Sequence, residues 1–316
     1  MAFPIWLAVL MLLSISCVHR QSDGIDVMVR SFQALSGNHS KISIANDIGP
    51  FPSGGHLQGV QFLQVKDQDL AVVSGSSDQV AYMASIQLEA SPRVSSLIDL
   101  MEKPLKHAGG FQISDGYLSI GIEDNEARDT SVVQLYDIRN GLANATLVNQ
   151  MERSGPYERA TAGCVGLTFY KNKWICIVGN WHTKDLDIYT TSSPSIASTM
   201  HLTQTVTPMD SLRQDWWDDR WISYQNINLY TYNGRCYLLG FGQSEKGENI
   251  ADLFLFCADE GNHHLRKLYS RVFENNGCDF SLGTGAHFSD GKIENIVACD
   301  RHLSPVSNLY LFEQGL

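Results

Sequence analysis

The chain has 316 residues, of which 43% are hydrophobic and 18% are charged, so it can form a folded core and is not a disordered protein. Its 34 acidic residues outweigh 23 basic ones, and the net charge of -11 argues against a nucleic-acid or anionic-membrane binder. The 26 glycines and 9 prolines are near average numbers, which excludes a collagen-like chain.

The first residues have the pattern of an export signal. Residues 5–16 form an apolar run shorter than the roughly 20 residues that a membrane-spanning helix needs. Ser14-Ile15-Ser16 has the small-x-small pattern of a cleavage site. Cys17 follows directly, as in bacterial lipoproteins, although Ser14 stands where leucine is usual. We expect a signal peptide over residues 1–16 and an exported protein, either secreted or lipid-anchored at the cell envelope through Cys17.

An internal repeat organises the rest of the chain. Five stretches each contain an apolar strand, a tight polar turn, a second apolar strand, a polar loop and a third strand with aromatic residues. The stretches begin at Gly59, Gly110, Val165, Ile227 and Gly285. The predicted turns begin at Lys66, Ser114, Lys171, Tyr232 and Ser289, at spacings of 48, 57, 61 and 57 residues. Candidates for a fourth strand lie at residues 93–101, 145–152, 201–207 and 265–273.

Four short antiparallel strands per unit, repeated radially, are typical of a β-propeller. The fifth unit ends at Leu316 without a fourth strand, while residues 41–48 have strand character and no unit of their own. We therefore predict an all-β protein with a single domain over residues 41–316, preceded by a leader or linker segment over residues 17–40. The domain is a five-bladed β-propeller of four-stranded antiparallel blades, and the N-terminal strand closes the ring. A β-sandwich is the main alternative, and the regular spacing favours the propeller.

Six cysteines follow Cys17: Cys164, Cys176, Cys236, Cys257, Cys278 and Cys299. An even number in an exported chain suggests disulfide bonds, with buried free thiols as the alternative. Cys236 opens the second strand and Cys257 closes the third strand of the fourth unit, so we expect these two to pair. Cys164 with Cys176 and Cys278 with Cys299 are further candidate pairs that fit the register less well.

Antiparallel connectivity brings two parts of each propeller blade to the same face. These are the start of the innermost strand and the loop between the second and third strands. Polar residues recur at these positions in every unit, and we expect them to bind a ligand over the axis. The candidate ligand-binding residues there are His56, Gln58, His107, Arg128, Trp181, His182, Gln225, Gln243, Arg301 and His302. For any single residue the alternative is an ordinary polar loop.

Five acidic residues at the same positions are candidates for catalysis: Asp78, Glu123, Asp124, Asp279 and Asp300. Two carboxylates held roughly 5 to 9.5 Å apart can cleave a glycosidic bond, because one protonates the leaving group and the other acts as base or nucleophile.

Four histidines, His56, His107, His182 and His302, come from four different units and could share one metal ion. No HExxH motif and no Cys/His metal spacing accompanies them. For each histidine the alternative is a structural hydrogen bond. The cofactor therefore stays open, with a divalent cation such as calcium as the candidate.

A tryptophan-rich segment lies between the third and fourth units, at residues 210–226. It holds Trp216, Trp217 and Trp221, and it leads into an innermost strand. Flat aromatic rings beside polar groups suit a sugar, whose apolar face stacks while its hydroxyls form hydrogen bonds. We expect Trp216 and Trp217 to bind ligand, with a small satellite core of packed tryptophans as the alternative.

The five-unit pattern over about residues 41–316 resembles five-bladed β-propellers. That architecture includes arabinanase-like and fructosidase-like glycoside hydrolases, calcium-dependent nucleotidases and lectins. No family motif matches residue by residue, so the resemblance implies a fold and no catalytic residues. The clearest local motifs are Gly55-His56-Leu57-Gln58-Gly59 and His107-Ala108-Gly109-Gly110-Phe111-Gln112.

Together these features predict an exported propeller that binds a polar, carbohydrate-like ligand in an axial pocket. Glycoside hydrolysis by paired carboxylates is its candidate activity. The alternatives are a metal-dependent hydrolase or oxidase that uses the axial histidines, and a non-catalytic interaction scaffold of the envelope. The expected partner is a small polar ligand or a glycan and not a nucleic acid. Membrane contact would occur only through a lipid anchor at Cys17, and the oligomeric state is open.

Overall fold

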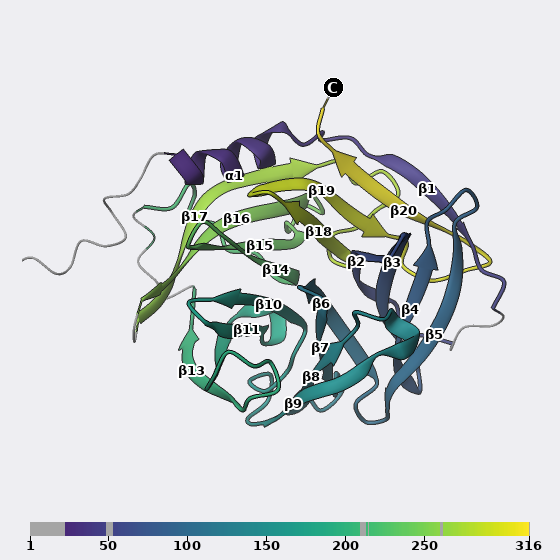
Figure 1. Ribbon diagram of the computed structural model, residues 1–316, viewed down its shortest axis with the longest axis horizontal. Coiled ribbons are helices and arrows are strands. Elements are labelled where there is room, and N and C mark those ends of the chain that lie inside the picture. Colours follow the sequence, from purple (N-terminus) through teal and green to yellow (C-terminus); the bar gives the residue numbers. More distant parts are fainter. Residues whose placement is uncertain (1–22, 49–52, 209–212, 214, 260–261, 316) are drawn as a thin grey trace, which may run out of the picture.

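The computed structural model describes residues 23–48, 53–208, 213, 215–259 and 262–315. Over these residues the chain is built mainly of antiparallel strands (Figure 1). The predicted all-β class is therefore confirmed. The predicted signal peptide and Cys17 lie outside the described residues.

The strands follow one another in antiparallel runs. The first run is β2 (Leu57–Val65), β3 (Gln68–Ser76), β4 (Val80–Gln87) and β5 (Arg93–Glu102). The second is β6 (His107–Ser114), β7 (Tyr117–Glu123), β8 (Thr130–Asp137) and β9 (Thr146–Ser154). The third is β10 (Cys164–Tyr170), β11 (Lys173–Gly179), β12 (Leu186–Thr191) and β13 (Met200–Val206). The fourth is β14 (Tyr224–Tyr232), β15 (Arg235–Gln243), β16 (Asn249–Asp259) and β17 (Asn262–Phe273). In the last, β18 (Thr284–Ser289), β19 (Lys292–Cys299) and β20 (Val306–Glu313) are followed in space by β1 (Ser40–Ala45), which pairs antiparallel with β20.

The first strands of the runs lie side by side near the middle of the molecule. In Figure 1 the strands β2, β6, β10, β14 and β18 are innermost, and β5, β9, β13 and β17 lie farther out. Parallel pairing joins Thr284 of β18 to Gly59 of β2, and Cys164 of β10 to Gly110 of β6. The inner strands therefore run in the same direction and begin at the same end of the molecule.

Apolar side chains gather between neighbouring runs and not at the middle. One cluster joins β2–β4 to β6 and β7, a second joins β8 and β9 to β10 and β11, and a third joins β10–β12 to β14–β16. A fourth joins β15–β17 to β18–β20, and a fifth joins β19, β20 and β1 back to β2–β4. Neighbouring residues of one strand serve different clusters, as Val72 and Val73 do, because successive side chains point to opposite faces.

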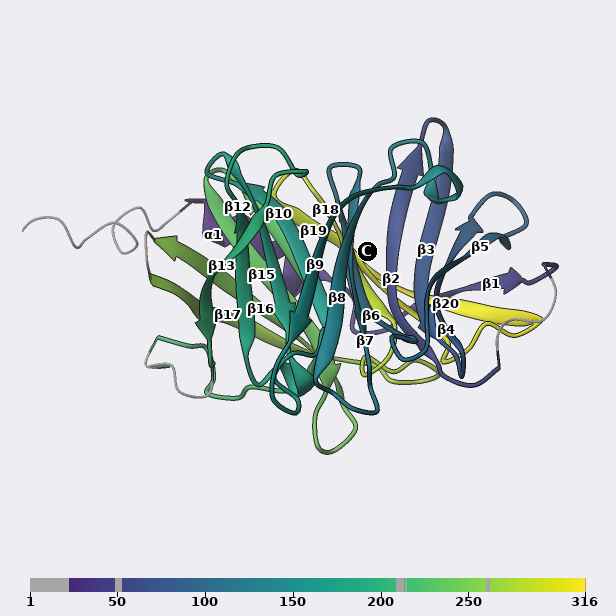
Figure 2. The ribbon, with the colours of Figure 1, turned by 90° about the horizontal axis from the view of Figure 1, so that it is seen from below.

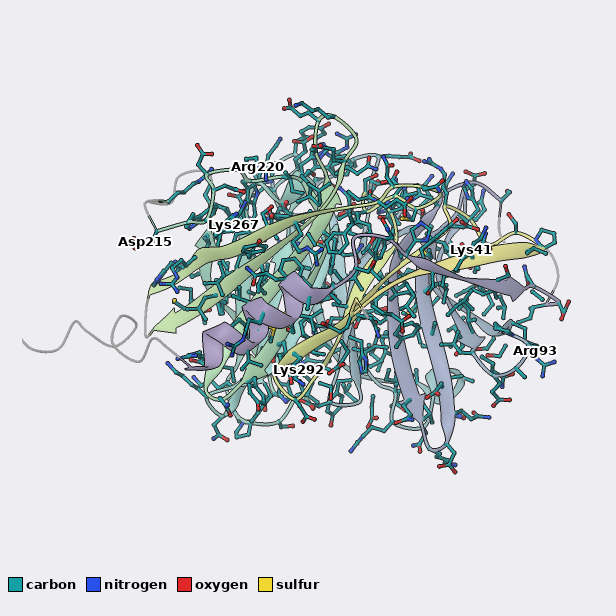
Figure 3. The ribbon with its side chains drawn as sticks, turned by 90° about the horizontal axis from the view of Figure 1, so that it is seen from above. Lys41, Arg93, Asp215, Arg220, Lys267 and Lys292 are labelled. Atoms are coloured by element: carbon teal, nitrogen blue, oxygen red, sulfur yellow. The ribbon has the colours of Figure 1, made fainter. Side chains whose placement is uncertain are left out.

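The helix α1 (Asp23–Ala34) lies in the segment that was predicted to be a linker. Met28, Phe32 and Leu35 recur at helical spacing, are at most 3% exposed, and pack into the cluster between the fourth and last runs. Figure 3 shows the helix lying across the outside of the strands. Arg271 of β17 donates hydrogen bonds of 2.7 Å to the carbonyl oxygens of Phe32 and Leu35, which satisfies carbonyls at the helix C-terminus. No helix among the described residues is both long and apolar enough to cross a membrane.

The predicted disulfide bonds are wrong, because all six cysteines of the described chain are buried free thiols. Cys236 is paired in register with Phe256, so the neighbouring Cys257 points to the other face of the sheet. The two thiols accordingly belong to different apolar clusters. The other two candidate pairs are divided between clusters in the same way.

Candidate functional site

The candidate site lies where the inner strands begin, an end of the molecule that we call the site pole. The loops between second and third strands and those between fourth and first strands reach the same end, as the antiparallel pairing requires (Figure 2). Figure 2 shows the molecule from the side, with these strands running across its thickness.

Three buried amide side chains connect the inner strands at the axis. Gln112 of β6 accepts hydrogen bonds of 2.7 Å from the backbone N–H groups of Leu167 on β10 and Leu229 on β14. Asn228 of β14 accepts from Gln61 Nε2 of β2 at 3.0 Å and from the backbone N–H of Ala286 on β18 at 2.8 Å. Gln61, Gln112 and Asn228 are at most 4% exposed. At this depth the axis is therefore filled by a hydrogen-bonded amide core.

The glycines of the two local motifs allow the inner strands to approach one another closely. A Cβ atom on Gly110 would lie 2.3 Å from Asn226 Oδ1, and one on Gly59 would lie 2.7 Å from the Phe111 ring. Gly109 contributes its carbonyl oxygen to a 2.8 Å hydrogen bond from Ser74 Oγ. These glycines serve packing at the axis, and the residues beside them form the site.

A chain of four polar side chains lies next to the amide core, on the side of the site pole. Gln58 Nε2 is 2.8 Å from His56 Nδ1 and 2.9 Å from His107 Nε2. His107 Nδ1 is 3.2 Å from Glu123 Oε1, and Glu123 Oε2 accepts a 2.7 Å hydrogen bond from the backbone N–H of Ala162. Gln58 and Glu123 are 2% and 1% exposed, whereas His56 is only half-buried. We call His56, Gln58, His107 and Glu123 the axial cluster.

One amide group bridges the two imidazoles of the axial cluster. Gln58 Nε2 carries two hydrogens and can donate one to each ring, and His56 Nδ1 also lies 3.2 Å from the carbonyl oxygen of Leu57. His107 Nδ1 lies 3.2 Å from Glu123 Oε1 but has no hydrogen-bond partner among the described residues. Burial, followed by the neighbouring His107, lowers the pKa of His56 from 6.5 to about 4. Arg301 and His302 lower the same pKa further.

Two buried acceptors at the axial cluster have no hydrogen-bond partner. They are Gln58 Oε1 and Asn226 Oδ1, on side chains that are 2% and 0% exposed. Asn226 Nδ2 donates hydrogen bonds to the carbonyl oxygens of Gln58 and Leu282, at 2.6 and 3.0 Å. A buried polar atom without a partner is costly, so a donor such as a water or a ligand hydroxyl suits these positions.

The loop between β19 and β20 borders the axial cluster. The backbone N–H of Leu57 donates to the carbonyl oxygen of Arg301 at 2.8 Å, which brings this loop next to His56. Arg301 and His302 are exposed, so the predicted residues of the first, second and last units do come together at the site pole.

Three other predicted ligand-binding residues form a second group at the rim of the site pole. The Arg128 guanidinium lies 3.8 Å from the centre of the Trp181 ring. The Trp181 and His182 rings are 5.4 Å apart, and His182 Nδ1 is 2.9 Å from Ser223 Oγ. His182 is therefore engaged away from His56 and His107.

Four of the five predicted catalytic acids form local hydrogen bonds. Asp78 is exposed and accepts from Ser53, and Asp124 accepts from the backbone of its own loop. Asp279 accepts from Ser281, and Asp300 accepts from Asn308 and from the Tyr310 hydroxyl at 2.6 Å. Only Glu123 belongs to the axial cluster. The described contacts therefore give the cluster one carboxylate and not the predicted pair.

Trp216 and Trp217 pack against β17, the outer strand of the fourth run, and do not lie at the axial cluster. Trp216 Nε1 donates to the carbonyl oxygen of Leu265 at 3.0 Å, and the Trp217 N–H donates to that of Lys267 at 3.0 Å, both on β17. The Trp216 ring packs against Phe254 and Trp221, which is the satellite core that the sequence left as the alternative. The Trp217 ring is 60% exposed.

A buried lysine fixes the tryptophan segment on β17. Lys267 Nζ is 2.8 Å from Asp218 Oδ1 and 3.1 Å from Asp252 Oδ2, and its side chain is 0% exposed. Figure 3 shows Lys267 beside Arg220, at the end of the molecule away from Lys41 and Arg93. The ion pair between Lys267 and Asp218 therefore holds the tryptophan segment against β17.

Gln225 and Gln243 are half-buried near the start of β14 and at the end of β15. Gln243 Nε2 donates to Asn249 Oδ1 at 3.1 Å, and the buried Asn249 in turn holds the backbone at Glu274. Gln243 therefore has a structural partner, and Gln225 is adjacent to Asn226 at the axis.

No group of three or more His, Cys, Asp or Glu residues in the described part of the chain is arranged to hold a metal ion. Only His56 and His107 of the four predicted histidines are in contact, with ring centres 5.7 Å apart.

The amide core was not predicted from the sequence. Gln61, Gln112 and Asn228 lie in the middle of β2, β6 and β14, and an amide side chain at this position of three innermost strands was the signal that could have revealed them.

An open groove of about 460 Å³ lies beside α1 and is bordered by Arg30, Lys292 and Glu294. It is separate from the axial cluster, so it does not correspond to the predicted axial pocket.

No protein-family model and no curated protein matches the sequence. Solved structures do match in fold. The catalytic domain of a GH62 α-L-arabinofuranosidase from Coprinopsis cinerea superposes with a TM-score of 0.52 at 11% identity, over 88% of this chain and 98% of that one. An exo-1,5-α-L-arabinanase from a bovine ruminal metagenomic library gives a TM-score of 0.51 at 8% identity, over 83% and 94% of the two chains.

A bifunctional GH43-CE protein from Bacteroides eggerthii gives a TM-score of 0.51 at 12% identity and covers 86% of this chain. The present chain spans only 34% of that protein, about a third of its length. These neighbours are five-bladed β-propellers, so the resemblance predicted from the repeat is confirmed at the level of architecture. At these identities the likeness is one of fold alone.

Proposed function

We propose that the chain is a five-bladed propeller closed by β1, and that it binds a neutral, hydroxyl-rich ligand of carbohydrate type at the axial cluster. Two observations support the ring. The apolar clusters link the runs in a cyclic order, and β1 pairs with β20 at one edge while Ala45 bridges to Arg93 of β5 at the other. A ring of this kind leaves no long exposed sheet edge.

The proposal includes export, with a signal peptide over residues 1–16, a leader over residues 17–40 and a propeller domain over residues 41–316. Attachment to the envelope through Cys17 remains the alternative to free secretion. Because α1 packs between the fourth and last runs, the folded unit takes in part of the leader as well.

The observation that carries the binding proposal is the Gln58 amide held between two imidazoles, with its own oxygen unpaired. Neutral imidazole and amide groups both donate and accept hydrogen bonds, as sugar hydroxyls do. The cluster is buried on one side and open at His56, so a ligand can reach it from the site pole. The buried Glu123 carboxylate of the cluster disfavours an anionic ligand, whereas hydroxyl groups can bond to the amide and imidazole groups.

Glycoside hydrolysis is the finer part of the proposal, and it is the outcome that an assay must decide. Two-carboxylate hydrolysis needs a second acid roughly 5 to 9.5 Å from the first. Glu123 is the candidate acid of the axial cluster, while Asp78, Asp124, Asp279 and Asp300 have local partners. The proposed function is therefore ligand binding, with hydrolysis as an added activity to be tested.

The test is a glycan array on the purified full-length protein, followed by calorimetry with the best ligand and a screen for its hydrolysis. His56→Ala is expected to weaken binding by about tenfold or more, because it removes a partner of Gln58. His201→Ala, at an exposed histidine on β13, is the matched control and should bind as the wild type does. Binding to no glycan, or equal binding by the His56→Ala variant, would overturn the proposal.

A further inference from the structure

We infer that the rim group at Trp181 is a second sugar-binding subsite, so that the ligand is an extended oligosaccharide and not a single sugar. This inference rests on the proposed function. The subsite consists of Tyr157, Arg128 and Trp181, with Glu158 and Lys184 at its border, and we call these five residues the rim platform.

Backbone strain marks the rim platform. Ten non-glycine residues of the described chain have positive φ, and six of them lie in the tight turns between first and second strands, where hairpin geometry requires it. The other four lie at the site pole and gather around Trp181. They are Arg128 (φ 56°), Glu158 (φ 63°), His182 (φ 56°) and Thr183 (φ 49°). A β-branched residue such as Thr183 is rare in this region, and strained residues of this kind cluster at ligand sites.

The side chains of the rim platform form an ordered stack. The Arg128 guanidinium lies 3.8 Å from the centre of the Trp181 ring and 5.6 Å from the centre of the Tyr157 ring. Arg128 Nη1 donates to the Tyr157 hydroxyl at 2.8 Å and to Glu158 Oε1 at 3.0 Å. Lys184 Nζ holds the other Glu158 oxygen at 2.8 Å. The arginine and the acid are thus oriented before any ligand arrives.

This stack leaves a face that suits a sugar ring. Tyr157 is 63% exposed although its hydroxyl is fixed, so its ring presents an immobilised apolar surface to solvent. The Glu158 carboxylate and the Arg128 and Lys184 cations supply acceptors and donors at the edge of that surface. An aromatic face beside fixed polar groups matches the apolar face and the hydroxyls of a pyranose or furanose ring.

The rim platform and the axial cluster belong to one continuous surface. The loop that carries Tyr157 and Glu158 continues to Ala162, whose backbone N–H donates to Glu123. Ala162 is four positions after Glu158, so the Cα atoms of these two residues are at most roughly 14 Å apart. On the other side, Asp124 follows Glu123 directly and its carbonyl oxygen accepts from the Arg128 N–H at 2.8 Å. An oligosaccharide can therefore contact both groups.

The test is calorimetry of the full-length protein with mono-, di-, tri- and pentasaccharides of the sugar that the array identifies. Affinity of the wild type should rise with length. Tyr157→Ala should lower affinity for the longest ligand by roughly 3- to 10-fold, because it removes a stacking surface. The same change should leave monosaccharide binding unaltered. Leu202→Ala, at a side chain that is 51% exposed on β13, is the control for loss of exposed apolar surface and should match the wild type at every length.

The outcomes separate the two proposals. If the wild type binds sugars equally well at all lengths, or if Tyr157→Ala does not change binding of the pentasaccharide, the rim platform is not a subsite and the axial proposal stands. If Tyr157→Ala weakens every length equally, the ring belongs to the axial site and the second subsite is refuted. If the wild type binds no sugar of any length, the proposed function fails and the rim inference fails with it.

Discussion

Gln58 Nε2 lies 2.9 Å from His107 Nε2, so a side-chain amide of β2 is hydrogen-bonded to an imidazole of the neighbouring inner strand β6. The same nitrogen lies 2.8 Å from His56 Nδ1. The Gln58 amide therefore links His56 to His107 within the axial cluster. His107 Nδ1 lies 3.2 Å from Glu123 Oε1, and the buried Glu123 carboxylate accepts a hydrogen bond from the backbone N–H of Ala162.

Replacing Gln58 by glutamate should reverse the protonation of His56. A carboxylate in contact with the ring favours the imidazolium, so the His56 pKa should rise by about 1 to 3 units from its value of about 4. NMR titration of the His56 ring measures this directly. Gln64→Glu, at an exposed position on the same strand, is the matched control. An unchanged His56 pKa in the Gln58→Glu variant would show that the two side chains are not in contact.

The pH dependence of ligand binding follows from the low pKa of His56. Because the folded pKa of about 4 lies below the usual 6.5, the neutral ring stabilises the fold fully above pH 6.5. That contribution is lost as the pH falls from 6.5 through 4. Binding should stay constant between roughly pH 8 and 5.5 and fall near pH 4, when His56 can no longer accept from Gln58. Calorimetry across this range checks it, and a fall in affinity centred near pH 6.5 would contradict the assignment.

Gln112→Leu should strongly destabilise the protein. The substitution keeps the side chain large and leaves the N–H groups of Leu167 and Leu229 buried without partners. We expect a loss of about 3 kcal/mol in the free energy of unfolding, measured by urea denaturation. Gln64→Leu should change it by less than about 0.5 kcal/mol, because that side chain is exposed. Equal effects of the two substitutions would mean that the amide core does not hold the inner strands.

The cysteines should remain unoxidised in the purified protein. Burial raises the pKa of Cys176 and of Cys236 to about 12, so their reactive thiolate forms are scarce. Alkylation in denaturant without reductant, followed by mass spectrometry of the peptides, should label all six from Cys164 to Cys299. In the native state the same reagent should label them slowly. A peptide in which Cys236 is linked to Cys257 would refute the structure of the fourth run.

Much of the fold was predictable because turn chemistry and apolar spacing act locally. Asp115-Gly116, Asn233-Gly234 and Asp290-Gly291 occupy the centres of the turns predicted for them, since glycine and its neighbour supply the required positive φ. Two turns lack glycine, and there the prediction was one residue late. Val65 pairs with Gln68 and Tyr170 with Lys173, so the turns begin at Val65 and Tyr170.

The site was only partly predictable, because it depends on contacts between units. The positions of His56, Gln58, His107 and Glu123 at strand starts and loops followed from antiparallel connectivity. Their contacts did not, because Gln58 and His107 are 49 residues apart and meet only when the inner strands pack. The face toward which a cysteine points changes with a one-residue shift in register, which is why the disulfide prediction for Cys236 and Cys257 was wrong.

The central claim is that the ligand binds at the axial cluster. A crystal structure of the full-length protein soaked with the tightest-binding trisaccharide tests it most directly. We expect sugar density at the site pole, with a hydroxyl within hydrogen-bond distance of His56 or of the unpaired Gln58 Oε1. Density for the sugar in the groove beside α1 or on Trp217, with the axial cluster unchanged, would contradict it.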